Sequence, residues 1–388
     1  MGILIVDDNE VNLFVIENIL KRAGYTDYFS FKSASELFDY LDANSNSTSP
    51  KEVDIILMDI MMPEMDGIEA CKLLQQLPHT KDIPVIFVTA LEDSNKVAEA
   101  LDAGGLDYVM KPINKTELLA RIRVVLRLKH EKDKNKKQEE KIKSQLELSM
   151  QVQNSLLSEP INDEKFTAKA SYIPAYKLAG DMYYWYKVDK TRYATIILDM
   201  MGHGISASLV CMFISSVLRD SIRQCADPEY VVNELNRWMY TLNIRNQQIP
   251  YYFTAIYLVV DTDKQTVEYV NAGHPAGFAL IDKEEVIELS NRTCAIGFFE
   301  KVEINKTTLT YNESVQILLY TDGVVETMEK VGMNQYSQLL KPSSKHIDLQ
   351  NVKEPISLIL DEDVQKKASD DMCVVFLQAE NKLHSEST

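Results

Sequence analysis

The sequence predicts an α/β doubly wound domain at the N-terminus, a helical linker, and an α+β domain at the C-terminus. Three observations support this division. Short apolar runs alternate with helical patterns up to about residue 125. A charged stretch without Gly or Pro follows, from Lys129 to Lys141. Beyond residue 160, strand-like segments are joined by short turns and helices are grouped, which is typical of an α+β domain.

Composition excludes several classes of protein. The 388 residues allow two or three domains, and an apolar fraction of 45% suffices for more than one core. The formal net charge of −17 argues against a nucleic-acid-binding surface, because phosphate backbones bind to basic faces. Five scattered cysteines without CxxC spacing fit free thiols better than disulfides or a zinc site. Every apolar run is broken short of a membrane span, so we expect a soluble, cytoplasmic protein without a membrane partner.

Residues 1–125 are predicted to form five βα units. Continuous apolar strands that alternate with helices belong to a parallel sheet buried on both faces. The predicted strands are Gly2–Val6, Asp27–Phe31, Val53–Met58, Ile83–Val88 and Leu106–Met110. The predicted helices are Val11–Arg22, Ala34–Ala43, Gly67–Gln76, Ser94–Ala103 and one that opens at Asn114.

Charged and hydroxyl side chains follow the predicted strands of this domain: Asp7 and Asp8 the first, Asp59 the third, Thr89 the fourth and Lys111 the fifth. The carboxyl ends of parallel strands meet at one edge of the sheet, where the functional crevice lies. Carboxylate oxygens of Asp8 and Asp59 suit Mg²⁺. Asp59 suits the nucleophile that becomes an aspartyl phosphate, whose oxygens Thr89 and Lys111 would bind.

Four motifs in this segment together resemble the response-regulator receiver domain family. They are Ile5-Val-Asp-Asp-Asn9, the run from Ile56 to Gly67, Val88-Thr-Ala90 and Tyr108-Val-Met-Lys-Pro112. The resemblance covers the whole segment and implies a flavodoxin-like fold. It also implies phosphorylation of Asp59 by a sensor histidine kinase, with Mg²⁺ held by Asp8, Asp59 and the carbonyl of Met61. Thr89 and Tyr108 fall where the family has its signalling pair.

The linker, residues 126–160, is predicted to be one long exposed helix that stops at Pro160. Its first half is rich in helix formers of mixed charge. Apolar residues then return close to a 3–4 spacing, at Ile142, Leu146, Val152 and Leu156. This stripe predicts either a coiled-coil seam of a homodimer or a packing surface for the next domain. A passive helical spacer is the remaining alternative.

The C-terminal domain, residues 161–382, is predicted to be a β-sandwich with helices outside, followed by a tail at 383–388. Predicted strands include Tyr193–Leu198, Tyr251–Val260, Thr266–Asn271, Val315–Leu319 and Cys373–Leu377, and the longer helices are Ile205–Ile222 and Pro228–Leu242. The strand predicted from Tyr193 is followed by Asp199, whose carboxylate stands directly before a glycine-rich turn. Gly202 in that turn has no Cβ, so its backbone can approach a metal or a phosphate closely.

Aspartates stand at strand ends or turns throughout this domain: Asp181, Asp199, Asp322 and the adjacent pair Asp370 and Asp371. A carboxylate cluster without Cys or paired His favours Mg²⁺ or Mn²⁺ over zinc. Two such ions activate a water and clamp a phosphoryl group. In that arrangement Asp199 bridges both ions, and Asp181, Asp322 and Asp370 complete the cage.

Five motifs that span the domain resemble the PPM-type, metal-dependent serine/threonine protein phosphatases in their bacterial SpoIIE-like branch. They are Leu178-Ala-Gly-Asp-Met-Tyr183, Leu198-Asp-Met-Met-Gly-His-Gly204, Asn271-Ala-Gly-His-Pro275, Tyr320-Thr-Asp-Gly-Val-Val-Glu326 and Ser369-Asp-Asp-Met-Cys373. Leu146–Leu157 also resembles the helix that precedes and regulates this domain in the branch. The resemblance implies metal ligation by Asp181, Asp199, the carbonyl of Met200, Asp322 and Asp370. Asp371 is then the neighbour, although the reverse assignment stays open.

Two positions depart from the family pattern, and two histidines need an interpretation. Ala179 replaces the usual first glycine, and Met200 stands where a smaller residue is frequent. His203 could protonate a leaving alkoxide, but a histidine between glycines is more often positioned by its turn. We interpret His274 as a structural residue that shapes a hairpin near the site.

We therefore expect a response-regulator protein phosphatase, in which phosphorylation of Asp59 regulates metal-dependent hydrolysis of phosphoserine or phosphothreonine on a partner protein. The resemblance suggests an anti-sigma-factor antagonist as this partner, and sigma-factor control in a stress response. One alternative is a phosphorylation-gated binding module without catalysis. Another is a receiver-linked nucleotide cyclase, because Ala179-Gly-Asp-Met-Tyr183 faintly resembles the GGDEF signature, although Met182 is apolar where that signature has an acid.

Overall fold

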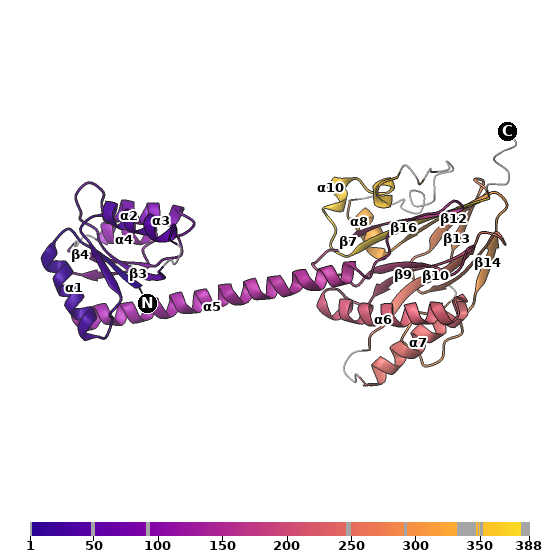
Figure 1. The fold of residues 1–388 in the computed structure, drawn as a ribbon, viewed down its shortest axis with the longest axis horizontal. Helices are drawn as coiled ribbons and strands as arrows, with labels where there is room; N and C mark the ends of the chain where they lie inside the picture. The colour runs from indigo at the N-terminus through magenta and orange to yellow at the C-terminus, as the bar shows by residue number, and fades with distance from the viewer. Residues whose placement is uncertain are drawn as a thin grey trace. The chain divides into compact units, whose positions relative to one another are not determined.

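The computed structural model describes residues 2–47, 51–90, 94–245, 250–290, 293–331, 347, 349 and 352–381 (Figure 1). The chain divides into two compact units, Met1–Ile142 and Lys143–Thr388, and the boundary falls within one long helix. Each unit has its own apolar core. The predicted domain end at residue 382 and the tail at 383–388 lie outside the described residues.

The N-terminal unit is a five-stranded parallel sheet with strand order β2-β1-β3-β4-β5, which confirms the doubly wound fold. Its elements are β1 (Gly2–Val6), α1 (Glu10–Arg22), β2 (Tyr28–Phe31), α2 (Ala34–Ser45), β3 (Val53–Asp59), α3 (Gly67–Gln76), β4 (Val85–Thr89), α4 (Ser94–Asp102), β5 (Asp107–Met110) and α5 (Lys115–Asn154). The predicted elements are all present, with small differences at their ends.

Both faces of this sheet are buried. Ile3 and Ile5 of β1 pack in the layer of α1 and α5, whereas Leu4 and Val6 pack in the layer of α2 and α3. Successive side chains of a strand point to opposite faces, so helices on both sides require strands that are apolar throughout. Polar side chains are consequently left to the strand ends.

Helix α5 joins the last helix of the first unit and the predicted linker into one element of 40 residues. Leu118 and Ile122 pack in the core of the first unit. Of the predicted apolar stripe, Ile142 and Val152 are exposed. The buried residue of the segment 143–160 is instead Gln153, which is 5% exposed. A polar side chain thus makes the most buried contact of the linker.

The C-terminal unit is a sandwich of two antiparallel sheets with helices on its outer faces, as predicted (Figure 1). One sheet has the order β14-β11-β10-β9-β8, and the other has the order β13-β12-β15-β16-β7-β6. The strands are β6 (Ile161–Asn162), β7 (Phe166–Ile173), β8 (Met182–Lys187), β9 (Arg192–Met200), β10 (Phe253–Asp261), β11 (Thr266–Ala272), β12 (Gly277–Ile281), β13 (Glu285–Leu289), β14 (Thr307–Thr310), β15 (Ser314–Tyr320) and β16 (Met372–Glu380). The helices are α6 (Ile205–Gln224), α7 (Pro228–Arg245), α8 (Asp322–Lys330), the 3₁₀ helix η2 (Pro355–Leu358) and α10 (Glu362–Gln365).

Three apolar layers hold this unit together. Between the sheets, Ile197 and Leu258 pack in one cluster with Ile317. On the outer face of the five-stranded sheet, Leu198 packs in a second cluster with Ile214 of α6, and Figure 1 shows α6 and α7 covering this face. Residues of α8 and η2 pack in a third cluster on the six-stranded sheet. The site described below lies at the ends of strands from both sheets.

The expectation that every apolar run stops short of a membrane span was wrong for α6, which is long and apolar enough by length and composition alone. Half of its most apolar window is buried. Ile214 and Leu218 are fully buried in the layer between α6 and the sheet. The apolar character of the helix therefore has a packing explanation within the domain. No second helix in the described parts of the chain meets the same criterion.

Candidate active sites

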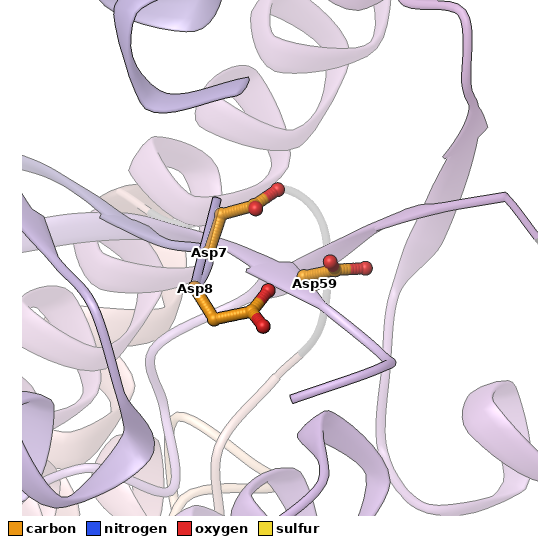
Figure 2. Close-up of side chains that lie close together, drawn as sticks. All are labelled: Asp7, Asp8 and Asp59. Atoms are coloured by element: carbon orange, nitrogen blue, oxygen red, sulfur yellow. The ribbon is translucent and has the colours of Figure 1, made fainter. Parts of the chain in front are cut away.

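Three aspartate carboxylates meet at the carboxyl ends of β1 and β3 (Figure 2). Oxygen atoms of Asp7, Asp8 and Asp59 lie within 4.8 Å of one another. Asp7 and Asp59 are buried, whereas Asp8 is exposed to solvent. Such a grouping offers oxygen ligands to a hard divalent cation such as Mg²⁺, with room for water on the exposed side.

Lys111 places its ammonium group between two of these carboxylates. Its Nζ lies 2.8 Å from Asp7 Oδ2 and 2.7 Å from Asp59 Oδ2. Burial raises the pKa of Asp59, and the hydrogen bond from Lys111 opposes this rise. Burial lowers the pKa of Lys111, but its bonds to Asp59 and Asp7 outweigh that effect and leave the pKa above its usual value. Lys111 therefore remains a cation that balances the two acids.

The other predicted residues of this edge lie around Asp59. Thr89 is buried at the end of β4, next to Val88, which pairs with Asp59 across the sheet. The backbone N–H of Met61 donates a hydrogen bond of 3.4 Å to Asp59 Oδ1. Tyr108 lies on the neighbouring strand β5, with the Arg121 guanidinium 5.6 Å from its ring centroid. The predicted set is thus collected at one edge of the sheet.

A second cluster lies at one end of the sandwich. Asp199 comes from the end of β9, and Asp322 opens α8 directly after β15. Asp370 and Asp371 precede β16, which pairs antiparallel with β15. Asp181 stands at the end of the connection from β7 to β8. Both sheets of the sandwich therefore contribute carboxylates.

These carboxylates raise one another's pKa. Burial, and then the charges of Asp322 and Asp370, raise the pKa of Asp199 to about 8. Burial, and then Asp199, hold the pKa of Asp181 well above its usual value, and burial followed by Asp370 raises the pKa of Asp322. The Oδ2 atom of Asp181 is buried and has no hydrogen-bond partner among the described residues. A divalent cation would relieve both the repulsion and the unpaired oxygen, so the donor set fits a metal site.

Asp370 and Asp371 differ in what they contact. The Asp371 carboxylate accepts backbone hydrogen bonds from Ala175 and Gly180, each 2.8 Å long. Burial raises the pKa of Asp371, and these two bonds oppose the rise. Asp370 is only partly buried, and its charge acts on Asp199 and Asp322. The contrast favours Asp370 as the metal ligand and Asp371 as the anchor of the loop before Asp181.

Ala179 and Met200, the two residues that depart from the family pattern, are both accommodated by the packing. The Met200 side chain is buried in the core beneath α6, so its size does not obstruct the cluster. Its carbonyl lies beside Gly180, where an added Cβ would come within 3.1 Å of that oxygen and 2.8 Å of the Gly202 carbonyl. Residue 180 therefore has to be a glycine. Ala179 has its N–H and its carbonyl both bonded to Gln153.

His203 lies beside the cluster and is exposed. Its ring stacks on Tyr176, with ring centroids 4.7 Å apart and an interplanar angle of 17°. Its charge is close enough to lower the pKa of Asp371. Gly202 and Gly204 have φ values of 80° and 78°, which favour glycine on both sides of the histidine. The turn and the stacked ring thus position His203, and its role as an acid stays a prediction.

His274 fits the structural interpretation. It is buried, and its Nδ1 lies 2.8 Å from the hydroxyl of Thr254, which pairs with Asp199 across β9 and β10. Its backbone N–H donates to Asn271 Oδ1 at 2.9 Å. Burial lowers the pKa of His274 to about 3, so the ring is neutral. The residue holds a turn next to β10, the strand that pairs with the one that carries Asp199.

Sequence reasoning missed two residues that support the cluster. The Gln153 side chain donates to the Ala179 carbonyl at 2.7 Å and accepts from the Ala179 N–H at 3.2 Å. The Thr321 hydroxyl accepts from the Cys373 N–H at 2.9 Å and hydrogen-bonds to Asp181. A glutamine in a polar helix gives no signal of such a contact. The position of Thr321 directly before α8 is that of an ordinary N-cap, although its hydroxyl makes no cap bond.

Two family models match the chain, one for each unit. The model of the response regulator receiver domain matches residues 3–123, and the model of stage II sporulation protein E (SpoIIE) matches residues 189–380. The first unit is therefore a receiver domain, and the second unit belongs to the SpoIIE family of PP2C-type phosphatase domains. A divalent metal ion is expected for this family, in agreement with the donor set of the aspartate cluster.

Individual relatives match one or the other part. Phosphoserine phosphatase RsbP of Bacillus subtilis (strain 168) is 37% identical over 240 residues, which cover 61% of this chain and 58% of RsbP. Phosphoserine phosphatase RsbU of the same strain is 28% identical over 209 residues, 53% of this chain and 61% of RsbU. Transcriptional regulatory protein YvrH, also from that strain, is 36% identical over 126 residues, 32% of this chain and 49% of YvrH. The chain thus spans about half of each curated relative.

Among solved structures, the phosphatase domain of SpoIIE from Bacillus subtilis, with a fragment of its regulatory domain, matches with a TM-score of 0.46 at 17% identity. The match covers 56% of this chain and 64% of that chain.

Proposed function

We propose that this chain is a response-regulator protein phosphatase. Phosphorylation of Asp59 regulates metal-dependent hydrolysis of phosphoserine or phosphothreonine on a partner protein. The observation that carries the proposal is the cluster of aspartates with mutually raised pKa values, in a domain of the SpoIIE family. The corresponding domains are residues 1–125, the linker 126–160 and the phosphatase domain 161–382.

In the phosphatase site, Asp199 would hold two ions of Mg²⁺ or Mn²⁺ together with Asp181, Asp322, Asp370 and the carbonyl of Met200. Bound divalent ions supply positive charge that polarises the phosphoryl group and lowers the pKa of a water. Asp371 positions the loop before Asp181 through its two backbone hydrogen bonds. His203 stands at the exposed side of the cluster, where it can return a proton to the leaving serine oxygen.

In the receiver, Asp59 is the phosphoacceptor and a sensor histidine kinase is the donor. Asp8, Asp59 and the Met61 carbonyl would hold Mg²⁺, a role that the grouping of Asp7, Asp8 and Asp59 supports. Asp7 holds the Lys111 ammonium next to Asp59. A phosphoryl group adds negative charge there, and Lys111 and Thr89 are placed to contact its oxygens.

The linker helix couples the two activities. Gln153 near the end of α5 bonds to Ala179, two residues before Asp181. A displacement of this part of α5 therefore pulls on the main chain of the loop that carries a metal ligand. The exposed Ile142 and Val152 on the same helix suit the seam of a homodimer.

The proposed substrate is a phosphorylated anti-sigma-factor antagonist, and the process is sigma-factor control in a stress response. RsbP and RsbU are phosphoserine phosphatases by name, which supports a phosphoserine substrate. The net charge of −17 disfavours a nucleic-acid partner. All five cysteines are free thiols, which supports a reducing, cytoplasmic location. The antiparallel sandwich and the SpoIIE match favour a phosphatase over the cyclase alternative.

Phosphate release tests the proposal directly. The full chain is incubated with Mn²⁺ and a phosphoserine protein or an aryl phosphate, with and without acetyl phosphate to load Asp59. The variants are Asp199→Asn, Asp59→Asn and a control, Asp189→Asn, whose exposed carboxylate pairs with Arg192. We expect metal-dependent release that Asp199→Asn abolishes, and an effect of acetyl phosphate that Asp59→Asn abolishes. Metal binding without release by the wild type would instead favour a phosphorylation-gated binding module.

A further inference from the structure

Two adjacent phenylalanines are exposed on the loop between β13 and β14. Phe298 is 47% exposed and Phe299 is 60% exposed. The Phe298 ring stacks on Tyr252, with centroids 4.2 Å apart, and lies 6.3 Å from the Phe299 ring. We name these three residues the aromatic platform. Contiguous exposed apolar surface of this kind marks contact sites more often than scattered single residues do.

The backbone that presents these rings is held by two asparagines of α7. Asn236, which is 3% exposed, accepts from the Gly297 N–H and donates to the Phe299 carbonyl, both at 3.0 Å. Asn243, two turns further along the same face of α7, donates to the carbonyls of Tyr251 at 2.7 Å and Gly297 at 3.0 Å. The rings are therefore carried by a fixed main chain.

Close packing of Gly297 adds to this frame. Gly297 has a φ of 106°, and an added Cβ would lie 2.7 Å from Met239 of α7 and 2.8 Å from the Tyr251 carbonyl. Glycine thus allows the loop to lie directly on the helix. The buried amides thus hold two phenylalanine rings in solvent. Exposure of these apolar rings is unfavourable and adds nothing to the core, which points to a contact made by the rings.

The platform adjoins the turn that follows Asp199. The Met201 N–H donates to the Tyr252 carbonyl at 3.0 Å, and Phe253 pairs with Met200 across β9 and β10. The Phe253 and Ile296 backbones also exchange two hydrogen bonds, of 3.1 and 2.8 Å. The segments that carry the rings therefore adjoin the backbone of the aspartate cluster, through a direct hydrogen bond or through strand pairing.

We propose that the aromatic platform is the docking surface for the segment of the protein substrate that flanks the phosphoserine. The occupant is an extended stretch with apolar side chains near the phosphoserine in sequence, because the backbone that carries the rings adjoins the turn after Asp199. Aromatic anchors supply most of the energy of many protein contacts. This inference rests on the proposed phosphatase function and adds the side chains that the enzyme selects.

Two phosphoserine decapeptides test the inference with the full chain and Mn²⁺. They are identical except that one has leucine and the other alanine at the two positions on each side of the phosphoserine. The variants are Phe298→Ala/Phe299→Ala and a control, Leu358→Ala, which removes a side chain of 43% exposure on η2. Thermal unfolding of each variant accompanies the kinetics.

We expect the wild type to hydrolyse the leucine peptide with a kcat/KM about tenfold higher than that of the alanine peptide, a factor that corresponds to about 1.4 kcal/mol. The double variant should lose this preference while it hydrolyses the alanine peptide within about twofold of the wild type, and Leu358→Ala should behave as the wild type. Equal rates for both peptides in the wild type, or an equal loss for both in the double variant, would overturn the inference alone. Failure to hydrolyse either peptide would overturn the proposed function with it.

Discussion

Gln153 and Ala179 hold each other through a pair of hydrogen bonds in which a single side-chain amide satisfies both main-chain groups of the alanine. The contact is buried and spans 26 residues of sequence. Ala179 precedes Gly180 and Asp181, so the amide lies two residues from a candidate metal ligand. Deletion of one partner leaves buried polar groups without a bond, which costs about 1–3 kcal/mol for each group.

Replacement of Gln153 by alanine should loosen the loop that carries Asp181. We expect Gln153→Ala to weaken Mn²⁺ binding and to lower kcat by at least about tenfold, which corresponds to about 1.4 kcal/mol. Gln151→Ala is the matched control, because Gln151 is exposed on the same helix. Calorimetric titration with Mn²⁺ and initial rates measure the two effects. Equal behaviour of the two variants would show that the amide contact does not support the site.

Replacement of Asp370 and replacement of Asp371 should have different effects on metal affinity and on stability. Asp370→Asn should lose Mn²⁺ affinity without loss of stability, since the carboxylate it removes repels Asp199 and Asp322. Asp371→Ala should lower the free energy of unfolding by about 1–3 kcal/mol, because it leaves the buried Gly180 N–H and the partly buried Ala175 N–H unpaired. Urea unfolding in EDTA and titration with Mn²⁺ separate these outcomes. Wild-type metal affinity in Asp370→Asn would reverse the assignment of the ligand.

We expect His274 to make the C-terminal unit sensitive to acid. Its pKa is about 3 in the folded state and near its ordinary value of 6.5 in the unfolded chain, so between these limits the unfolded chain binds the extra proton. The free energy of unfolding from this source is fully present above pH 6.5 and declines as the pH falls toward 3. His274→Gln should therefore show a smaller decline between pH 7 and pH 5 than the wild type.

Tryptophan fluorescence in urea provides this measurement, because both tryptophans, Trp185 and Trp238, belong to the C-terminal unit. His79→Gln serves as a control, since His79 lies in the receiver. The interpretation of His274 as a buried neutral ring would be wrong if its replacement left the pH dependence unchanged.

When Lys111 is replaced by methionine, we expect a metal ion to take over its role of balancing the charges of Asp7 and Asp59. Lys111→Met leaves the buried Asp7 and Asp59 without their cation, and breaking a buried ion pair costs about 3–5 kcal/mol. We expect this loss in EDTA and a larger stabilisation by Mg²⁺ in the variant than in the wild type. Hydrogen exchange of the β1 and β3 amides reports the effect, with the exposed Lys81→Met as control. A magnesium effect of the same size in both proteins would contradict the prediction.

Sequence patterns predicted those parts of the structure that depend on local periodicity. Asp59 and Asp199 could be placed at strand ends because an apolar run stops directly before each of them. Gln153 and Thr321 could not be identified, because their partners Ala179 and Cys373 are distant in the chain and are brought together only by the packed fold. The same holds for Phe298, whose exposure depends on Asn236 and Asn243 in α7.

The close packing of Gly323 on Asp371 has a consequence for how this family of sequences can change. A Cβ on residue 323 would lie 2.0 Å from the Asp371 carbonyl oxygen, so a larger residue has to displace the segment that carries Asp370 and Asp371. Asp322 and that segment are therefore linked by sterics as well as by charge. In related sequences, the two stretches can therefore change only together. A chimera that takes one of them from a distant homologue should have a misaligned aspartate cluster.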